Sequence, residues 1–133
     1  MTHEIKEVNV FCDYSADGLW IDGAYSNLED LLDELNITIP DFKELNEKIN
    51  KWQEQYEQFE FYLPEYNIKD TKEYKEFDKT GREIALRIRQ IVPDNIKVTY
   101  WDEANLKKYS ITPDGKFQDI TSEELKEIHD TFF

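Results

Sequence analysis

Residues 42–63 have the sequence FKELNEKINKWQEQYEQFEFYL, and this stretch decides the fold. Its apolar side chains recur at alternating intervals of three and four residues. The members of this row are Phe42, Leu45, Ile49, Trp52, Tyr56, Phe59 and Leu63. Such spacing places large side chains on one side of an α-helix, as in the seam of a coiled coil. The pattern predicts one long helix, which Asp41 caps and Pro64 ends.

A second row with the same spacing lies further along the chain, between Asp70, which can cap a helix, and about Ile91. Its members are Tyr74, Phe77, Gly81, Ile84, Ile88 and Ile91. Gly81 costs helix stability in this row. It either lets the two long helices approach each other closely or marks a break after Asp78. The two rows predict an antiparallel pair of helices that pack through these side chains.

The segments on either side of the helices have β patterns. Residues 7–14 and 19–21 predict a hairpin around an Asp-Gly turn, and 97–101, 107–111 and 116–120 predict three more strands. Ser26 or Asn27 can cap a short helix over residues 28–35, and a capping box at 121–124 opens a last short helix. The order predicts a single α+β domain over residues 1–133. Its sheet is mostly antiparallel, with two long packed helices and two short ones.

The charge of the chain is unevenly distributed. The net charge is −14, and residues 1–63 hold 15 acids and four bases while residues 64–133 hold 15 acids and 12 bases. No Lys or Arg lies between Lys6 and Lys43, a stretch that contains Glu7, Asp13, Asp17, Asp22, Glu29, Asp30, Asp33, Glu34 and Asp41. Binding of nucleic acid through phosphates is disfavoured, because it requires clustered cations. A partner with a basic surface is the natural complement.

The sequence gives little support for catalysis. The single Cys12 excludes an internal disulfide, and the two histidines, His3 and His129, lie near the ends of the chain. No phosphate-binding glycine motif is present. Asp13, Asp17 and Asp22 surround the first hairpin, and a turn explains them better than a metal site, because the spacing does not match a calcium loop. We expect no enzyme activity, no metal and no cofactor.

Cellular location is also suggested by the sequence. No apolar stretch approaches the length of a transmembrane helix, and the first residues lack the pattern of a signal peptide. We therefore expect a cytoplasmic protein without membrane contact.

The helix predicted over residues 28–35 carries four acids in an unfavourable arrangement. Glu29 with Asp33 and Asp30 with Glu34 are like-charge pairs four residues apart, each costing roughly 0.2–0.5 kcal/mol. This helix face is either simply solvated or a binding patch for Lys and Arg. Aromatic residues lie among neighbouring acids, as at tight interfaces. The predicted contact residues are Asp17, Asp22, Tyr25, Glu29, Asp30, Asp33 and Glu34, with Asp102 and Glu103 as a second group.

Two segments carry a resemblance to a known class. Residues 10–20, VFCDYSADGLW, and residues 98–103, VTYWDE, followed by a Pro-Asp-Gly hairpin, resemble small acidic immunity proteins that accompany bacterial polymorphic or contact-dependent toxins. The resemblance implies a cytoplasmic protein that binds and neutralises one cognate toxin domain, often a nuclease with a basic cleft. It assigns no functional residue, because such proteins span many folds.

The favoured hypothesis is therefore stoichiometric inhibition by a monomer that binds a basic toxin domain. Three alternatives stay open. The chain could be a decoy that mimics nucleic acid, a small metal-dependent enzyme that uses Asp13, Asp17 and Asp22, or an assembly module that pairs through an exposed helix row. Competition with nucleic acid would identify the decoy, and saturable metal binding would identify the enzyme. An obligate oligomer would identify the assembly module.

Overall fold

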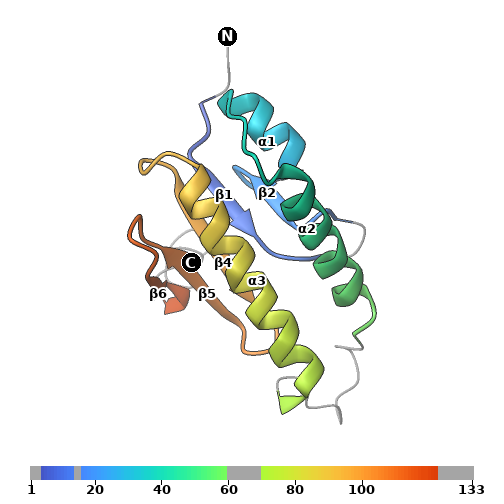
Figure 1. Cartoon of the computed structure of the whole chain (residues 1–133). Helices are drawn as coiled ribbons and strands as arrows, with labels where there is room; N and C mark the ends of the chain where they lie inside the picture. The colour runs from blue at the N-terminus through green and yellow to red at the C-terminus, as the bar shows by residue number, and fades with distance from the viewer. Residues whose placement is uncertain (1–3, 14–15, 60–69, 123–133) are drawn as a thin grey trace.

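The computed structural model describes residues 4–13, 16–59 and 70–122. Three short strands come first, β1 (Glu7–Val10), β2 (Leu19–Ile21) and β3 (Ala24–Ser26). Three helices follow, α1 (Leu28–Leu35), α2 (Phe42–Glu57) and α3 (Lys72–Ile91). The last strands are β4 (Lys97–Asp102), β5 (Lys107–Ile111) and β6 (Phe117–Asp119). In Figure 1, α2 and α3 cover one face of the sheet, and α1 lies beside the start of α2 at one end of this helical layer.

The six strands form one mixed sheet in the order β3-β2-β1-β4-β5-β6. Neighbouring strands pair antiparallel except β1 and β4, which are parallel, with Val8 opposite Val98. The helices α1 to α3 provide the long connection that a parallel pair requires. The predicted α+β class is thus confirmed, and the parallel pair at the centre of the sheet refines the expectation of a mostly antiparallel arrangement.

The two predicted apolar rows do pack against each other, on the sheet. Trp52 of α2 stacks on Phe77 of α3 at a centroid distance of 5.2 Å and on Tyr100 of β4 at 6.4 Å. Gly81 allows this arrangement, because a Cβ atom there would lie 2.7 Å from both the Trp52 and the Tyr100 ring. α3 is continuous through Gly81, so the glycine marks a close approach and not a break.

Several boundaries differ from the sequence-based expectations. α2 ends at Glu57, because the buried Phe59 leaves the helix and packs against Tyr74 and Phe77. Thr71, not Asp70, caps α3 by accepting a hydrogen bond from the Tyr74 backbone. β1 is shorter than predicted, and β3 was not predicted at all. Residues 121–122, where the predicted last short helix opens, are helical. The rest of that helix and residues 60–63 of the predicted 42–63 helix lie outside the described ranges.

Candidate protein-binding surface

Helix α1 is defined at both ends by its asparagines. The side chain of Asn27 accepts a hydrogen bond from the Asp30 backbone N–H at 2.8 Å, which identifies Asn27 as the N-cap. Asn36 ends the helix in the left-handed conformation, with φ of 54°. Leu28, Leu31 and Leu32 are buried against the core. One side of α1 is thus apolar and anchored, and its acids are left on the surface.

The exposed acids of α1 have no cation partner within the described part of the chain. We call Glu29, Asp30, Asp33 and Glu34 the α1 acidic face; all four side chains are exposed. Some acids elsewhere do have a cation partner: Glu83 lies 2.8 Å from Lys48, and Asp41 lies 2.6 Å from Arg87. No ion pair reaches the α1 acidic face from any described residue. Among residues 4–13, 16–59 and 70–122, nothing therefore compensates these four charges.

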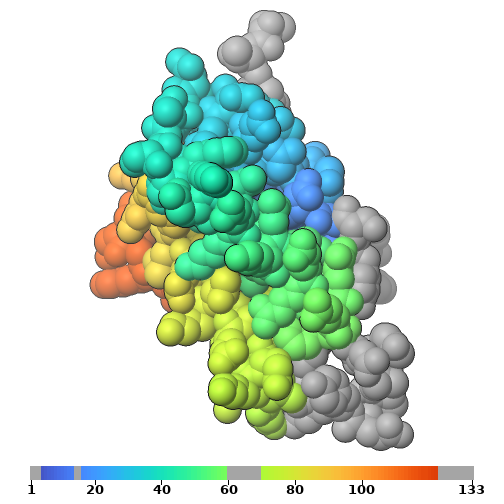
Figure 2. Space-filling model, turned by 45° about the vertical axis from the view of Figure 1, so that its right-hand side comes forward, coloured from blue at the N-terminus to red at the C-terminus, as the bar shows by residue number. Residues whose placement is uncertain are grey.

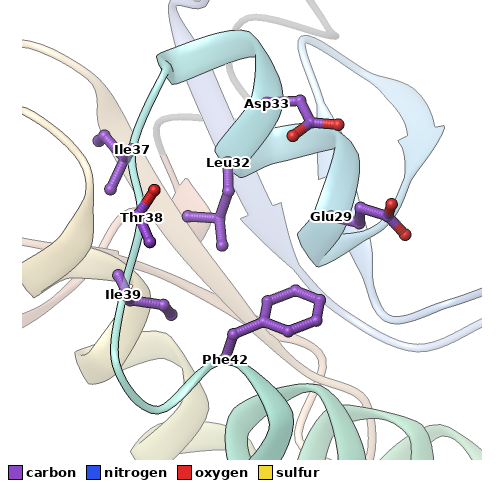
Figure 3. A pocket seen from close by; sticks show the side chains of 7 residues that line it. All are labelled: Glu29, Leu32, Asp33, Ile37, Thr38, Ile39 and Phe42. Atoms are coloured by element: carbon purple, nitrogen blue, oxygen red, sulfur yellow. The ribbon is translucent and has the colours of Figure 1, made fainter.

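A pocket lies directly beside two of these acids. This α1 pocket has a volume of about 290 Å³ and is lined by Glu29, Leu32, Asp33, Ile37, Thr38, Ile39 and Phe42. In Figure 3, Glu29 and Asp33 project from the same side of α1, and the Phe42 ring lies below Glu29. Figure 2 shows that α1, the connection to α2 and the start of α2 share one face of the molecule. Sequence analysis missed this pocket, because its apolar lining combines Leu32 of α1, Ile37 and Ile39 of the connection, and Phe42 of α2.

Tyr25 and Asp17 form a second exposed feature at the edge of the sheet. Tyr25 in the edge strand β3 is 54% exposed, and its hydroxyl donates a 2.8 Å hydrogen bond to Asp17. This hydrogen bond raises the pKa of the Tyr25 hydroxyl. The Tyr25 ring meets Trp20 edge to face at 6.2 Å, and Trp20 stacks on Phe11 at 4.6 Å. The result is a partly exposed aromatic row with one carboxylate at its end.

Asp22 has a structural role that the sequence did not reveal. Its carboxylate accepts hydrogen bonds from the backbone N–H groups of Lys6 and Glu7, at 3.0 and 2.8 Å. Its own backbone is left-handed, with φ of 50°, in the turn between β2 and β3. Asp22 thus ties that turn to the start of β1, although its side chain is exposed.

The expectation that Asp102 belongs to a surface contact group is wrong. Asp102 is only 3% exposed and accepts a hydrogen bond from the Tyr74 hydroxyl. Arg82 lies 3.5 Å from its carboxylate and also spans the rings of Tyr100, Tyr109 and Phe117. These contacts attach α3 to the sheet. Glu103 is partly buried and accepts a hydrogen bond from the Trp101 indole.

Cys12 and the carboxylates around the first hairpin are the residues that the sequence offered for catalysis or metal binding. Cys12 is buried, and this burial, followed by the charges of Glu57 and Glu103, raises the pKa of its thiol. A buried thiol that resists deprotonation is a poor nucleophile. Within residues 4–13, 16–59 and 70–122, no three His, Cys, Asp or Glu side chains gather in a metal-binding arrangement. Asp17 and Asp22 are engaged separately, by Tyr25 and by the start of β1.

None of the three helices in the described ranges is long and apolar enough to cross a bilayer.

These features define an α+β protein with an acidic helix face that has no cation partner among the described residues and that lies next to a pocket. Comparison with known families identifies it further. The profile of the Serratia CdiI immunity protein-like family matches residues 6–103, which include β1 to β4 and all three helices. The chain belongs to this family, and the resemblance to contact-dependent toxin immunity proteins is thereby confirmed. No curated protein and no solved structure matches the chain.

Proposed function

We propose that this protein neutralises one cognate toxin domain by binding it through the α1 acidic face. The observation that carries the proposal is that four exposed carboxylates on one short helix lack any cation partner among the described residues. The toxin domain is a nuclease whose basic cleft complements this charge. Asp17 and Tyr25 form an additional contact at the sheet edge.

The arrangement of charge on α1 opposes the stability of the helix. Asp33 and Glu34 lie near its C-terminus, where the helix dipole disfavours anions, and the last turn carries no basic residue. The like-charge pairs along the helix add a further cost. A basic partner relieves both effects, because its cations supply the positive charge that no described residue brings to α1. Long-range attraction also accelerates the encounter, most strongly at low ionic strength.

The proposed mode of action is stoichiometric and not catalytic. One monomer covers the active site or substrate channel of one toxin domain in the cytoplasm. Inhibition is then complete at a 1:1 ratio and does not depend on time, metal or cofactor. Titration of the toxin's nuclease activity with this protein tests the stoichiometry directly.

Charge reversal on α1 tests the proposed surface. The double substitution of Asp30 and Asp33 to Lys is expected to weaken the complex with the cognate toxin domain by at least about tenfold and to slow association, while the melting temperature is preserved. The matched control reverses Glu73 and Glu76 in the first two turns of α3, at the end of the helical layer far from α1 (Figure 1). Equal affinity of the α1 variant and the wild-type chain would contradict the proposed surface.

The salt dependence of association provides a second measurement. Rates of association and dissociation are measured for the wild-type chain at about 0.01 and 0.5 M salt, where screening lengths differ severalfold. We expect association to slow by one to two orders of magnitude, and dissociation to change little. Competition with unrelated nucleic-acid-binding proteins would instead point to a decoy that mimics nucleic acid.

A further inference from the structure

We propose that the α1 pocket receives the side chain of a single arginine from the toxin. This inference rests on the proposed function, and it specifies the chemistry of the central contact. The pocket is lined by apolar side chains and by two acids, Glu29 and Asp33, which we call its rim. A side chain that is apolar along its stem and cationic at its tip satisfies both halves at once.

The apolar half of the pocket fits the aliphatic stem of the incoming side chain. Leu32 and Ile39 are buried, and Ile37 and Phe42 are partly buried against the core. These side chains are therefore held in place before the partner arrives, which limits the entropy lost on binding. Phe42 also presents an aromatic ring at the pocket (Figure 3), on which a guanidinium can stack.

The acidic half of the pocket fits the guanidinium. Glu29 and Asp33 are one helical turn apart and project from the same side of α1 (Figure 3). Neither has a cation within ion-pair distance among the described residues. A planar group with five donors can bridge two carboxylates, whereas an ammonium acts as a compact and strongly hydrated point charge. The geometry therefore favours arginine over lysine.

Other occupants fit the pocket less well. A purely apolar anchor would bury its surface beside two unpaired carboxylates, which costs free energy. A metal ion would find two carboxylates and the Thr38 hydroxyl, but the remaining lining residues are apolar. Divalent cations prefer six or more oxygen ligands.

A small probe tests the pocket without any toxin. The full chain, labelled with ¹⁵N, is titrated with N-acetyl-L-arginine methylamide and, separately, with the lysine and citrulline analogues. We expect amide shifts confined to residues 29–42 with an arginine dissociation constant on the order of millimolar, weaker lysine binding and no citrulline binding. Equal responses to arginine and lysine, or shifts spread over all acidic segments, would overturn the inference.

Matched charge removals on α1 then test the pocket in the complex. Glu29→Gln with Asp33→Asn neutralises the rim of the pocket, and Asp30→Asn with Glu34→Gln removes the same charge from the same helix outside it. The rim pair is expected to weaken toxin binding by at least about 30-fold, and the outer pair by about threefold. Equal losses would refute the pocket and leave the proposed surface intact; no loss from either pair would refute both.

A steric substitution separates shape from charge. Thr38 is exposed and lines the α1 pocket, so Thr38→Phe fills the space without altering any carboxylate. We expect this variant to retain its melting temperature, to lose the arginine-analogue shifts and to bind the toxin at least about 30-fold more weakly. Thr38→Ser serves as the control and keeps full binding. Wild-type affinity of a folded Thr38→Phe variant would show that nothing enters the pocket.

Discussion

The hydroxyl of Tyr74 on α3 donates a 2.6 Å hydrogen bond to the buried carboxylate of Asp102 on β4. The two residues are 28 positions apart in the chain, and their contact joins the helical layer to the sheet. The same hydroxyl accepts a hydrogen bond from the Ala104 backbone N–H at 2.9 Å, while Asn105 donates to Asp102. A buried acid is thus satisfied from three directions, by Tyr74, Asn105 and Arg82.

Tyr74→Phe should lower the free energy of unfolding by about 1.5–3 kcal/mol, because it removes a hydrogen bond from a buried carboxylate. Tyr25→Phe is the matched control, since it removes a tyrosine–aspartate hydrogen bond of similar length at an exposed site. The control should cost less than about 0.5 kcal/mol. Urea denaturation measures both values. Similar losses for the two variants would show that burial does not set the strength of the Tyr74 contact.

Gly81→Ala should destabilise the protein although alanine favours helices by about 1 kcal/mol over glycine. The added methyl group would lie 2.7 Å from both the Trp52 and the Tyr100 ring, and neither buried ring has room to retreat. We expect a net loss of about 1–3 kcal/mol in denaturant unfolding. Lys79→Ala, at an exposed position of α3, should stay within about 0.5 kcal/mol of wild type. A stabilised Gly81→Ala variant would disprove the close approach.

The pair of Asp41 and Arg87 should make stability depend on acidic pH. Hydrogen bonds from Arg87 hold the pKa of Asp41 below its ordinary value of 3.8. The unfolded chain therefore takes up this proton first, so the contribution of the pair is present above pH 3.8 and is lost as the pH falls through the lowered pKa. Melting temperatures of wild type and Asp41→Asn should differ at neutral pH and converge in acid. Asp94→Asn is the control. If the melting temperatures of Asp41→Asn and wild type differed by the same amount at neutral and acidic pH, the linkage would be refuted.

Local patterns predicted the helices well, because large apolar residues at intervals of three and four can all be buried together only if the segment is helical. The packing of Trp52 on Phe77 follows from those rows. The end of α2 could not be predicted, since Phe59 continues the spacing but contacts the same core from outside the helix. β3 was missed because a segment of only three residues is too short to show an alternating pattern. It is a strand because it pairs with β2.

The candidate site was predictable only in part. The exposure of α1's acids follows from the leucines on its other side. The absence of Lys and Arg between Lys6 and Lys43 can be read from the sequence. The burial of Asp102 depends on Tyr74 and Arg82, which are distant in the chain and leave no local signal. The α1 pocket likewise depends on how the chain turns between α1 and α2, which brings Phe42 next to Glu29.

Glu34→Lys should raise the stability of the protein and weaken toxin binding. We expect such opposite effects where the charges of a helix serve binding and not folding. The new cation lies at the C-terminal end of α1 and four residues after Asp30, so both the helix dipole and the new ion pair favour it. We expect about 0.5–1 kcal/mol of added stability, seen as a higher melting temperature, together with weaker toxin binding. Glu29→Lys places the cation in the first turn, where the dipole disfavours it, but it also removes the repulsion between Glu29 and Asp33. We therefore expect a smaller gain in stability than from Glu34→Lys, together with weaker toxin binding. A larger gain in melting temperature from Glu29→Lys than from Glu34→Lys would show that the helix dipole does not act on the stability of α1.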